Sequence, residues 1–559
     1  MRHRWPTDTQ FTRLVLDVEE DVCGVCGCNL HVCDHRQHRI FTLQGPLELV
    51  CRLAHCSDRH CVAHSKTISP YAETTLTLPW WLIGWDVFCW MGQRRFARHW
   101  SVPQIRTELV DSYQIHLSPD AIERSLGRYQ TMLAARQQDP QVLAAAYRDV
   151  TGLVLSIDGL QPEKGHETLY VVRDLRTKRV WFAEALLSST VEEVRRLLQR
   201  ARDWAKQLGL PVQLWLSDKQ DAFVQGIAAE FPGVPHRYCA NHFLRDLAKP
   251  MLSADSHAKV QMRSKVRGLR TIERAVLEQM RSDAAEPSAS PLPEAMSAAE
   301  PSTSVEFSPV PSPTDASDVV LDYCSAVRGI LNDDQGGPLH PPGLRMAEAL
   351  EEVRASLQRN LDAKRPGPAH AQLQQLAGCI DRGLAATQDE RAIVRQEVHE
   401  VQRVAATLEV ANGSVTQRQA EFECLQKEFA CQRTPFYQHL ATVMASFMTG
   451  LFAGGEPFAS LLDNLDLERW FRLPKGHERR IHGHKHAGVR IVQEGPTLLL
   501  ALDAHQAHPQ PFTVDDLSPY QDATVPTCQD EAIHRRKVMR KARSKKNGSS
   551  SSSNWNDDT

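Results

Sequence analysis

The sequence predicts an α/β protein whose mixed β-sheet is interrupted by an all-helical insertion and preceded by a small cysteine-rich module and a helical region. Three observations lead to this fold class. Short apolar runs that suit buried strands recur between residues 153 and 238. Long stretches with helical spacing follow them. Seven of the 14 cysteines precede His64, which indicates metal binding rather than disulfides in a protein without signs of secretion.

Composition limits the partners and the location of the chain. Its 559 residues include 65 basic and 68 acidic ones, for a formal net charge of −3. Any affinity for nucleic acid must therefore come from local patches. No apolar run reaches the roughly 18 residues that a membrane helix needs. The N-terminus lacks the apolar region of a secretory signal, so we expect a cytoplasmic protein with no membrane partner.

Residues 1–70 contain the cysteine-rich module. Cys23 and Cys26 form one pair, and Cys56 and Cys61 form another. The residues between the pairs alternate apolar and polar side chains around Gly45-Pro46, which predicts a β-hairpin. Two cysteine pairs joined by a hairpin are typical of a zinc ribbon, in which four thiolates hold a structural Zn²⁺ that a small module needs for stability. Nearby residues leave other ligand sets open: Cys28, His31, Cys33, His35, Cys51, His55, His60 and His64.

Residues 71–148 are predicted to be helical. An aromatic-rich stretch at 78–100 suits a buried helix, and Ser101 and Ser118 suit the N-caps of two further helices. The two capped helices and their tight turn resemble a helix-turn-helix, whose second helix would present Arg124 and Arg128 to DNA. An ordinary helical hairpin is the alternative, because that face also carries two acids, Asp120 and Glu123.

Two aspartates follow apolar runs that read as buried strands. Asp158 follows the run at 153–157, and Asp218 follows the run at 212–216 after one serine. An unpaired carboxylate is costly to bury, and a divalent cation such as Mg²⁺ would compensate it with oxygen ligands from separate elements. The alternative is that each acid is an ordinary turn residue at the end of a strand.

The order of the predicted elements distinguishes these two readings. Three strands, a helix, a strand, a helix, a short strand and a helix follow one another between residues 151 and 249. This is the order of the ribonuclease H fold, in which the first and fourth strands are neighbours. Asp158 and Asp218 are therefore expected side by side at one end of the sheet, where independent turn residues would have no cause to meet.

Two short motifs give the chain a resemblance to a known family. Cys239-Ala-Asn-His242 follows the strand after Asp218 and resembles the CxxH signature of Mutator-like transposases. Asn464-Leu-Asp-Leu-Glu468, followed by spaced basic residues and Gly483, resembles the block that carries the third acid of the DDE transposases of bacterial insertion sequences. The chain departs from that block in having Asp463 where the family often has a second asparagine.

The resemblance spans roughly residues 20–270 and 435–500 and implies an enzyme. A transposase of this kind uses two Mg²⁺ or Mn²⁺ ions, held here by Asp158, Asp218 and Glu468, to cleave phosphodiesters at the ends of an insertion sequence and to transfer the freed strands. It implies double-stranded DNA as partner, a homo-oligomer on that DNA, and a bacterial cytoplasmic, nucleoid-associated location. Two alternatives stay open: a DNA-binding regulator derived from a transposase with a non-catalytic ribonuclease H-like domain, and a structural protein built on the long helices.

The ribonuclease H-like core is predicted to be split. Far more chain separates Asp218 from Glu468 than separates the first two acids, so an inserted domain is needed. We place the core at 149–270 and 435–510, and the helical insertion at 271–434. Within the insertion, residues 283–317 are rich in Pro, Ser and Ala and are predicted to be a disordered linker. The helices at 391–432 could instead form a coiled coil that mediates dimers.

Basic residues follow the third acid and predict contacts with the DNA backbone beside it. They are Arg469, Arg472, Lys475, Arg479, Arg480 and Lys485, with one acid, Glu478, among them. The neighbouring histidines are expected to add polar contacts: His477, His482, His484 and His486. Residues 511–559, basic and then serine-rich, are predicted to be a disordered tail that contacts DNA without sequence preference.

Overall fold

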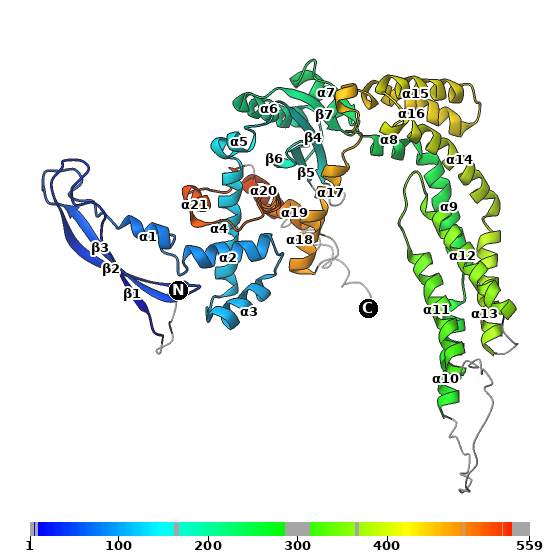
Figure 1. Ribbon diagram of the computed structural model, residues 1–559, viewed down its shortest axis with the longest axis horizontal. Helices are drawn as coiled ribbons and strands as arrows, with labels where there is room; N and C mark the ends of the chain where they lie inside the picture. Colours follow the sequence, from blue (N-terminus) through cyan, green and yellow to red (C-terminus); the bar gives the residue numbers. More distant parts are fainter. Residues whose placement is uncertain are drawn as a thin grey trace, which may run out of the picture. The chain divides into compact units, whose positions relative to one another are not determined.

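The computed structural model divides the chain into two compact units (Figure 1). It describes Trp5 and residues 9–160, 167–285, 313–363, 368–483, 487–527 and 529–538. The first unit comprises Met1–Cys239 and Asp463–Thr559, and the second comprises Ala240–Leu462. Among the described residues, no helix is long and apolar enough to cross a membrane.

A three-stranded sheet begins the first unit. β2 (Leu30–Thr42) and β3 (Gly45–Cys56) form the predicted antiparallel hairpin, and β1 (Thr12–Leu16) pairs with β3 in parallel. Gly45 follows the turn with a φ of +128°, which side-chain-bearing residues rarely adopt. One small cluster of buried residues packs against this sheet, with Leu16, Ile40, Leu49, Cys51 and Leu53 as its buried members. So small a core leaves the module dependent on another source of stability.

Five helices follow the sheet. They are α1 (Tyr71–Leu76), α2 (Trp85–Phe96), α3 (Val102–Tyr113), α4 (Pro119–Gln137) and α5 (Pro140–Ala146). Both predicted N-caps are confirmed: Ser101 forms a reciprocal capping box with Gln104, and the Ser118 hydroxyl accepts a hydrogen bond from the Ala121 N–H at 3.2 Å. The aromatic-rich stretch supplies α2, whose Trp85, Phe88 and Phe96 are buried against α4.

A five-stranded mixed sheet forms the centre of the first unit. Its strands are β4 (Leu153–Leu160), β5 (Thr168–Asp174), β6 (Arg179–Leu186), β7 (Val212–Ser217) and β8 (His236–Tyr238), in the order β6-β5-β4-β7-β8. β5 is antiparallel to β4 and β6, whereas β4, β7 and β8 are parallel. The first and fourth strands of the sheet are therefore neighbours, as the element order predicts.

Helices cover both faces of this sheet. α6 (Val191–Leu208) and α7 (Asp221–Glu230) pack on one face, which presents Leu155, Ile157 and Tyr170. The other face presents Leu169 and Val171 to helices from the C-terminal segment. These helices are α17 (Leu465–Trp470), α19 (Gly488–Glu494) and α20 (Pro496–Ala507), and α18 (Arg472–His482) lies between the first two in sequence. Successive side chains of β5 point to opposite faces of the sheet, so the same strand contributes to the apolar core on each face.

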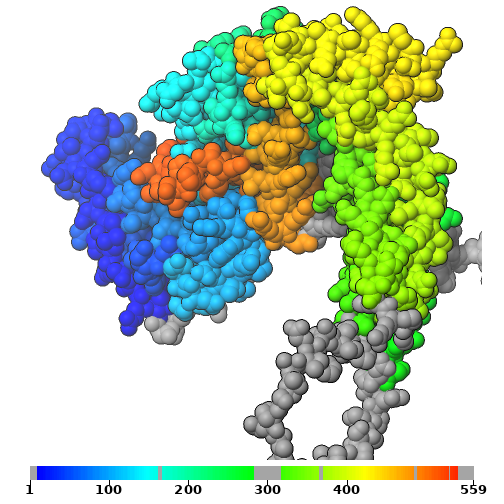
Figure 2. Space-filling model, turned by 45° about the vertical axis from the view of Figure 1, so that its right-hand side comes forward, coloured from blue at the N-terminus to red at the C-terminus, as the bar shows by residue number. Residues whose placement is uncertain are grey.

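The C-terminal segment is ordered further than predicted. Phe512 and Leu517 of the supposed disordered tail are buried with residues of α2 and α4, and Figure 2 shows this segment against the helices near the N-terminus. The side-chain amide of Gln529 donates to the carbonyl of Glu494 at 2.6 Å. Buried apolar anchors thus extend the folded unit into the predicted tail. Residues 539–559 lie outside the described part of the chain.

The second unit is helical throughout its described residues. Its helices are α8 (Ala240–Leu247), α9 (Lys249–Lys265), α10 (Leu269–Ala285), α11 (Pro313–Asn332), α12 (Pro342–Ala363), α13 (Pro368–Ala385), α14 (Gln388–Ala406), α15 (Val415–Ala430) and α16 (Pro435–Leu451). α9 to α13 share one apolar core. Helices α10 and α11 occupy the first and last residues of the predicted linker, and its remaining residues, 286–312, are not described.

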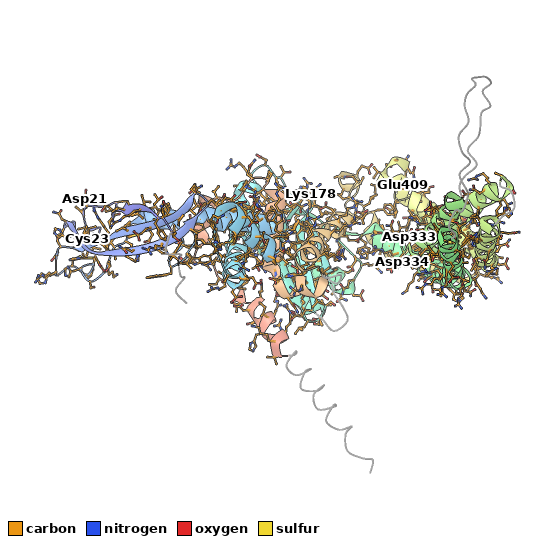
Figure 3. The ribbon with its side chains drawn as sticks, turned by 90° about the horizontal axis from the view of Figure 1, so that it is seen from below. Asp21, Cys23, Lys178, Asp333, Asp334 and Glu409 are labelled. Atoms are coloured by element: carbon orange, nitrogen blue, oxygen red, sulfur yellow. The ribbon has the colours of Figure 1, made fainter. Side chains whose placement is uncertain are left out.

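Buried polar side chains fix the ends of several helices in the second unit. Asp255 on α9 accepts hydrogen bonds from the backbone N–H groups of Gly343 and Leu344 at 2.7 and 2.8 Å, at the start of α12. Lys259, one turn further along, bonds the loop that carries Asp333 and Asp334 (Figure 3). The residues at 391–432 form two helices, since α14 ends at Ala406 and α15 begins at Val415 and packs on α16. A coiled coil between two chains stays a prediction.

Candidate functional site

Asp158 and Asp218 lie at the same end of neighbouring parallel strands. The prediction that the first strand stops at Asp158 is wrong. β4 continues to Leu160, and Asp158 pairs with Val171 of β5. Asp218 directly follows β7. Ser156 is opposite Leu216 in the β4–β7 register, so two residues further on Asp158 lies level with Asp218. The sheet thus juxtaposes two carboxylates that are far apart in sequence.

Glu468 is brought to this end of the sheet by α17. Its N–H donates to the carbonyl of Asn464 at 3.0 Å in the first turn, and Leu467 and Trp470 on the other side of the helix are buried against the sheet. The Sγ atom of Cys239, which follows β8, accepts a hydrogen bond from the N–H of Asn464 at 3.3 Å. The cysteine of the CxxH motif therefore fixes the start of the helix that carries the third acid.

The charges of Asp218 and Glu468 both act on Asp158. Burial, together with the negative charges of Asp218 and Glu468, raises the pKa of Asp158 to about 7. A hydrogen bond from the N–H of Gly159, at 2.7 Å, and the positive charge of Lys475 act in the opposite direction. At Asp158 the repulsion by two carboxylates acts together with burial, and a cation bound beside it would relieve both.

The acidic cluster is open rather than a closed cage. Among the described residues, the carboxylate oxygens of Asp158, Asp218 and Glu468 do not all lie within 4.8 Å of one another. Mg²⁺ keeps several water ligands and takes few carboxylates from the protein, so it does not require a tighter cage. His242 of the CxxH motif lies on α8, in the second unit.

A buried ion-pair network that the sequence did not reveal supports α17. Arg173 of β5 is 2% exposed, and its guanidinium lies 3.3 Å from Asp466 on α17 and 3.9 Å from Asp503 on α20. It also lies over the ring of Trp470, 5.5 Å from the centroid. Asp503 in turn accepts a hydrogen bond from the N–H of Val180 at 3.0 Å. Arg173 thereby links the sheet to the six-residue helix that carries Glu468.

The basic residues after Glu468 fall on the outer side of α17 and α18. Arg469, Arg472, Arg479 and Arg480 are exposed and Lys475 is partly buried, whereas Lys485 lies outside the described residues. Glu478, the acid in this run, is buried, and burial raises its pKa to about 7. α18 ends at Gly483, which has a φ of +68°. The exposed side of the helix is therefore basic.

His477 is buried, whereas the sequence predicts a contact with DNA for it. It is 1% exposed, and its Nδ1 atom lies 2.9 Å from Nδ1 of His99. Its ring stacks on Phe96, and burial lowers its pKa to about 2. His482 is exposed and near Glu478, while His484 and His486 lie outside the described residues. The prediction of a DNA contact is therefore wrong for His477, because helical spacing turns it toward the core.

The two arginines of the candidate helix-turn-helix differ in their surroundings. Arg124 on α4 is exposed, as are Asp120 and Glu123. Arg128 instead donates a hydrogen bond to the carbonyl of Ala523 in the C-terminal segment. That segment covers the second half of α4, where Arg136 pairs with Asp516 at 2.9 Å. By contrast, the exposed Asp120, Glu123 and Arg124 lie in the first turns of α4.

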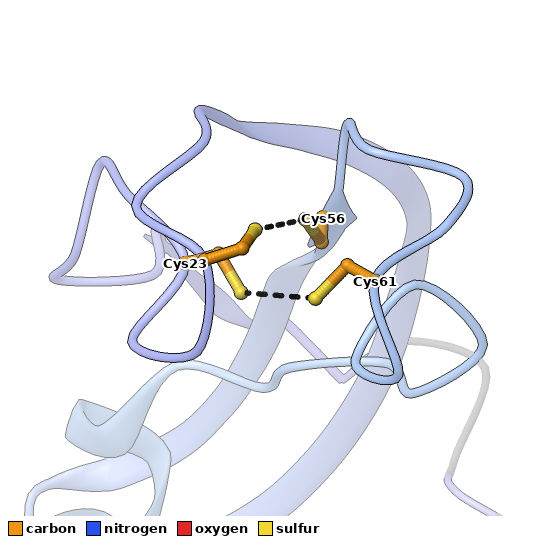
Figure 4. Close-up of side chains that lie close together, drawn as sticks. Cys23, Cys56 and Cys61 are labelled. Atoms are coloured by element: carbon orange, nitrogen blue, oxygen red, sulfur yellow. Dashed lines mark hydrogen bonds between the residues drawn. The ribbon is translucent and has the colours of Figure 1, made fainter.

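The four predicted zinc ligands form a compact cluster (Figure 4). The Sγ atoms of Cys23 and Cys61 are 3.9 Å apart, those of Cys26 and Cys56 are 3.3 Å apart, and all four lie within 4.8 Å of one another. Zn–S bonds of about 2.3 Å place tetrahedral ligands about 3.8 Å apart. The four cysteines could therefore hold a zinc ion.

Local turns position these thiols. The N–H of Gly27 donates to the carbonyl of Cys23 at 2.8 Å, which closes the first knuckle, and the N–H of Ala63 donates to Sγ of Cys61 at 3.4 Å in the second. Burial raises the pKa of the Cys56 thiol to about 12. A hydrogen bond from the backbone of Cys28, and then one from Cys56, lowers the pKa of Cys26 to about 7. A cation would relieve the cost of ionising the buried thiol.

Most of the alternative ligands have other contacts, and in the part of the module that the structure describes only Cys28 groups with one of the four cysteines, Cys26. Cys33 donates to the carbonyl of Leu53 at 3.3 Å, and Cys51 belongs to the core of the sheet. His64 contacts the carbonyl of Cys56 at 2.6 Å through Nδ1. Cys28 forms a second, smaller group with Cys26 and Asp58. Among the described residues of the module, no histidine belongs to a group of three possible metal ligands.

Comparison with known proteins gives no family assignment. No protein-family model matches the sequence, and no curated protein matches it.

Proposed function

We propose that this protein is a DDE transposase, which cleaves DNA at the ends of an insertion sequence and transfers the freed strands. One observation carries the proposal. Asp158 and Asp218 lie at the same end of two parallel strands, and the charge of Glu468, from a helix that follows the whole inserted unit, acts there too. The charges of Asp218 and Glu468 both act on Asp158. Independent surface acids would gain nothing from such convergence, since their charges repel one another. Functional sites are where such repulsion is retained.

The topology supports the same proposal. In a ribonuclease H-like core, the first strand lies between the second and the fourth, as β4 lies between β5 and β7 here. A helical unit between β8 and α17 fits the interrupted core of the resemblance. The Cys239–Asn464 hydrogen bond accounts for why a CxxH motif would accompany the third acid.

Divalent cations would relieve the repulsion at Asp158, and Asp158, Asp218 and Glu468 would hold them. Bound there, Mg²⁺ or Mn²⁺ would activate the attacking oxygen and stabilise the leaving oxygen at a phosphodiester. Lys475 reduces the repulsion between the carboxylates and the phosphate backbone. The exposed arginines of α17 and α18 would hold that backbone at the acidic end of the sheet.

DNA cleavage tests this proposal. The substrate is a duplex that contains the DNA flanking the gene on each side, incubated with the full-length protein and Mg²⁺ or Mn²⁺. We expect metal-dependent nicks at one position on each side, and Asp218→Asn should abolish them while DNA binding persists. Binding of the same duplex without cleavage by the unaltered protein would instead support a DNA-binding regulator with a non-catalytic core.

A further inference from the structure

Trp80 is an exposed tryptophan held in an unfavourable backbone conformation. It is 85% exposed, the highest value among the large hydrophobic residues for which the structure gives one. Its φ of +66° lies in the left-handed region that side-chain-bearing residues avoid. The exposed indole contributes little to the stability of the fold, whereas the positive φ of Trp80 costs free energy. Residues held in this way cluster at ligand-binding sites.

The loop around Trp80 is clamped on both sides. The N–H of Phe41 on β2 donates to the carbonyl of Leu82, and the N–H of Gly84 donates to the carbonyl of Phe41, each at 2.8 Å. The neighbouring Trp81 packs edge-on against Phe88 of α2, with centroids 5.5 Å apart. The outward direction of Trp80 is therefore fixed by the loop and is not a sign of local disorder.

A cation lies beside the exposed ring. The guanidinium of Arg36 on β2 is 5.7 Å from the centroid of the Trp80 ring. Arg36 is itself held by an ion pair with Glu73, whose other oxygen lies 3.4 Å from Nδ1 of His38. The ring of His38 contacts the carbonyl of Trp81 at 2.6 Å through Nε2. The aromatic face and the cation are thus positioned before any ligand arrives.

We propose that Trp80, with Arg36 beside it, is a stacking platform for an unpaired base of bound DNA. The base of an unpaired nucleotide offers a flat π-face to the indole, and the phosphate of that nucleotide can contact the guanidinium. The polar surroundings (Arg36, His38 and Glu73) do not suit an apolar protein anchor or insertion into lipid. An unpaired base is favoured over a paired one because opening a duplex step costs free energy.

This inference rests on the proposed function in taking DNA as the partner, and it can fail separately. The test compares a blunt duplex with the same duplex carrying a two-nucleotide single-stranded flank that includes 2-aminopurine. Binding of the full-length protein is measured without Mg²⁺, so that cleavage does not contribute. Stacking of one base corresponds to about a tenfold gain in affinity. Quenching of 2-aminopurine should report the stack directly.

Five variants separate stacking from other effects. Trp80→Ala should lose about tenfold in affinity for the flanked duplex and nothing for the blunt one, while Trp80→Phe should keep part of the gain. Arg36→Gln should weaken the same preference. Tyr71→Ala is the matched control, because Tyr71 is also an exposed aromatic residue of this region, at 71% exposure. Trp80→Gly should not lower the melting temperature, since glycine tolerates a positive φ.

The outcomes decide whether Trp80 binds an unpaired DNA base, a lipid surface or neither. Equal affinity of Trp80→Ala and the unaltered protein for the flanked duplex, or an equal loss for both duplexes, would overturn the proposal. Trp80-dependent binding to phosphatidylglycerol vesicles, with DNA binding unchanged, would assign the indole to a lipid surface and overturn it too. If cleavage fails but the Trp80-dependent preference is found, the stacking platform stands and the transposase proposal falls.

Discussion

Replacing Asp158 by Asn should stabilise the magnesium-free protein at pH 8. The carboxyl group has an ordinary pKa of 3.8 and, in the folded chain, one of about 7 because of burial and the charges of Asp218 and Glu468. At pH 8 the folded protein therefore bears the cost of an ionised, repelled carboxylate that the unfolded chain does not. Three pKa units correspond to at most about 4 kcal/mol of unfolding free energy.

The sign of the pH dependence follows from the same shift. Between pH 3.8 and about 7 the folded state binds a proton that the unfolded state has lost, so lowering the pH stabilises the unaltered protein. The advantage of the Asn variant should be near zero at pH 4, clearly smaller at pH 5 than at pH 8, and fully present above pH 7. Mg²⁺ should reverse the order by stabilising the unaltered protein alone.

Urea unfolding at pH 5 and pH 8 measures this effect, in buffer without magnesium and without a chelator that would strip the cysteine cluster. Asp174→Asn is the matched control in the same sheet. Asp174 is buried and accepts hydrogen bonds from the N–H of Val154 and from the N–H and hydroxyl of Thr177, so its replacement should destabilise the protein at both pH values. An Asp158→Asn protein no more stable than the unaltered one at pH 8 would refute the reasoning.

Three further predictions address other parts of the molecule. Purified protein should contain about one Zn²⁺ per chain by elemental analysis. The Cys26→Ser variant should lose this Zn²⁺, and its three-stranded sheet should unfold. Metal-free protein with that sheet intact would contradict this prediction. Asp255→Ala should destabilise the second unit by about 1–3 kcal/mol in thermal unfolding, because two N–H groups of α12 lose their buried acceptor. The double variant Arg472→Gln, Arg479→Gln should lower the salt dependence of DNA affinity by roughly two counterions, and an unchanged slope would place the DNA elsewhere.

The elements that rest on local patterns could be predicted from the sequence. The apolar runs before Asp158 and Asp218 gave two neighbouring strands, and the serine-proline pairs gave helix starts at Ser101 and Ser118. The cysteine spacing gave the four-thiol cluster. Each of these signals lies within a few residues or follows from the order of elements. The end of the strand did not follow from the apolar run, since β4 continues past Asp158 and pairs with β5 as far as Leu160.

Contacts between distant segments could not be predicted in the same way. Arg173 looks like an ordinary strand residue until Asp503 and Asp466 are placed beside it. The burial of His477 depends on His99 and Phe96, and the second half of α4 is covered by residues beyond 496. A single sequence has no periodicity that links segments separated by a whole inserted unit. Charged residues in an apolar strand, as at Arg173, are the one signal that such a partner exists.

Iron-directed cleavage of the protein tests most directly whether the three acids share a metal site. Fe²⁺ in place of Mg²⁺, with ascorbate and oxygen, generates radicals that cut the chain next to the bound ion. We predict backbone cuts near residues 158, 218 and 468 in one protein, suppressed by excess Mg²⁺ and all lost together in Asp218→Asn. Cuts near 158 and 218 without one near 468, or cuts that persist in Asp218→Asn, would contradict a site shared by the three acids.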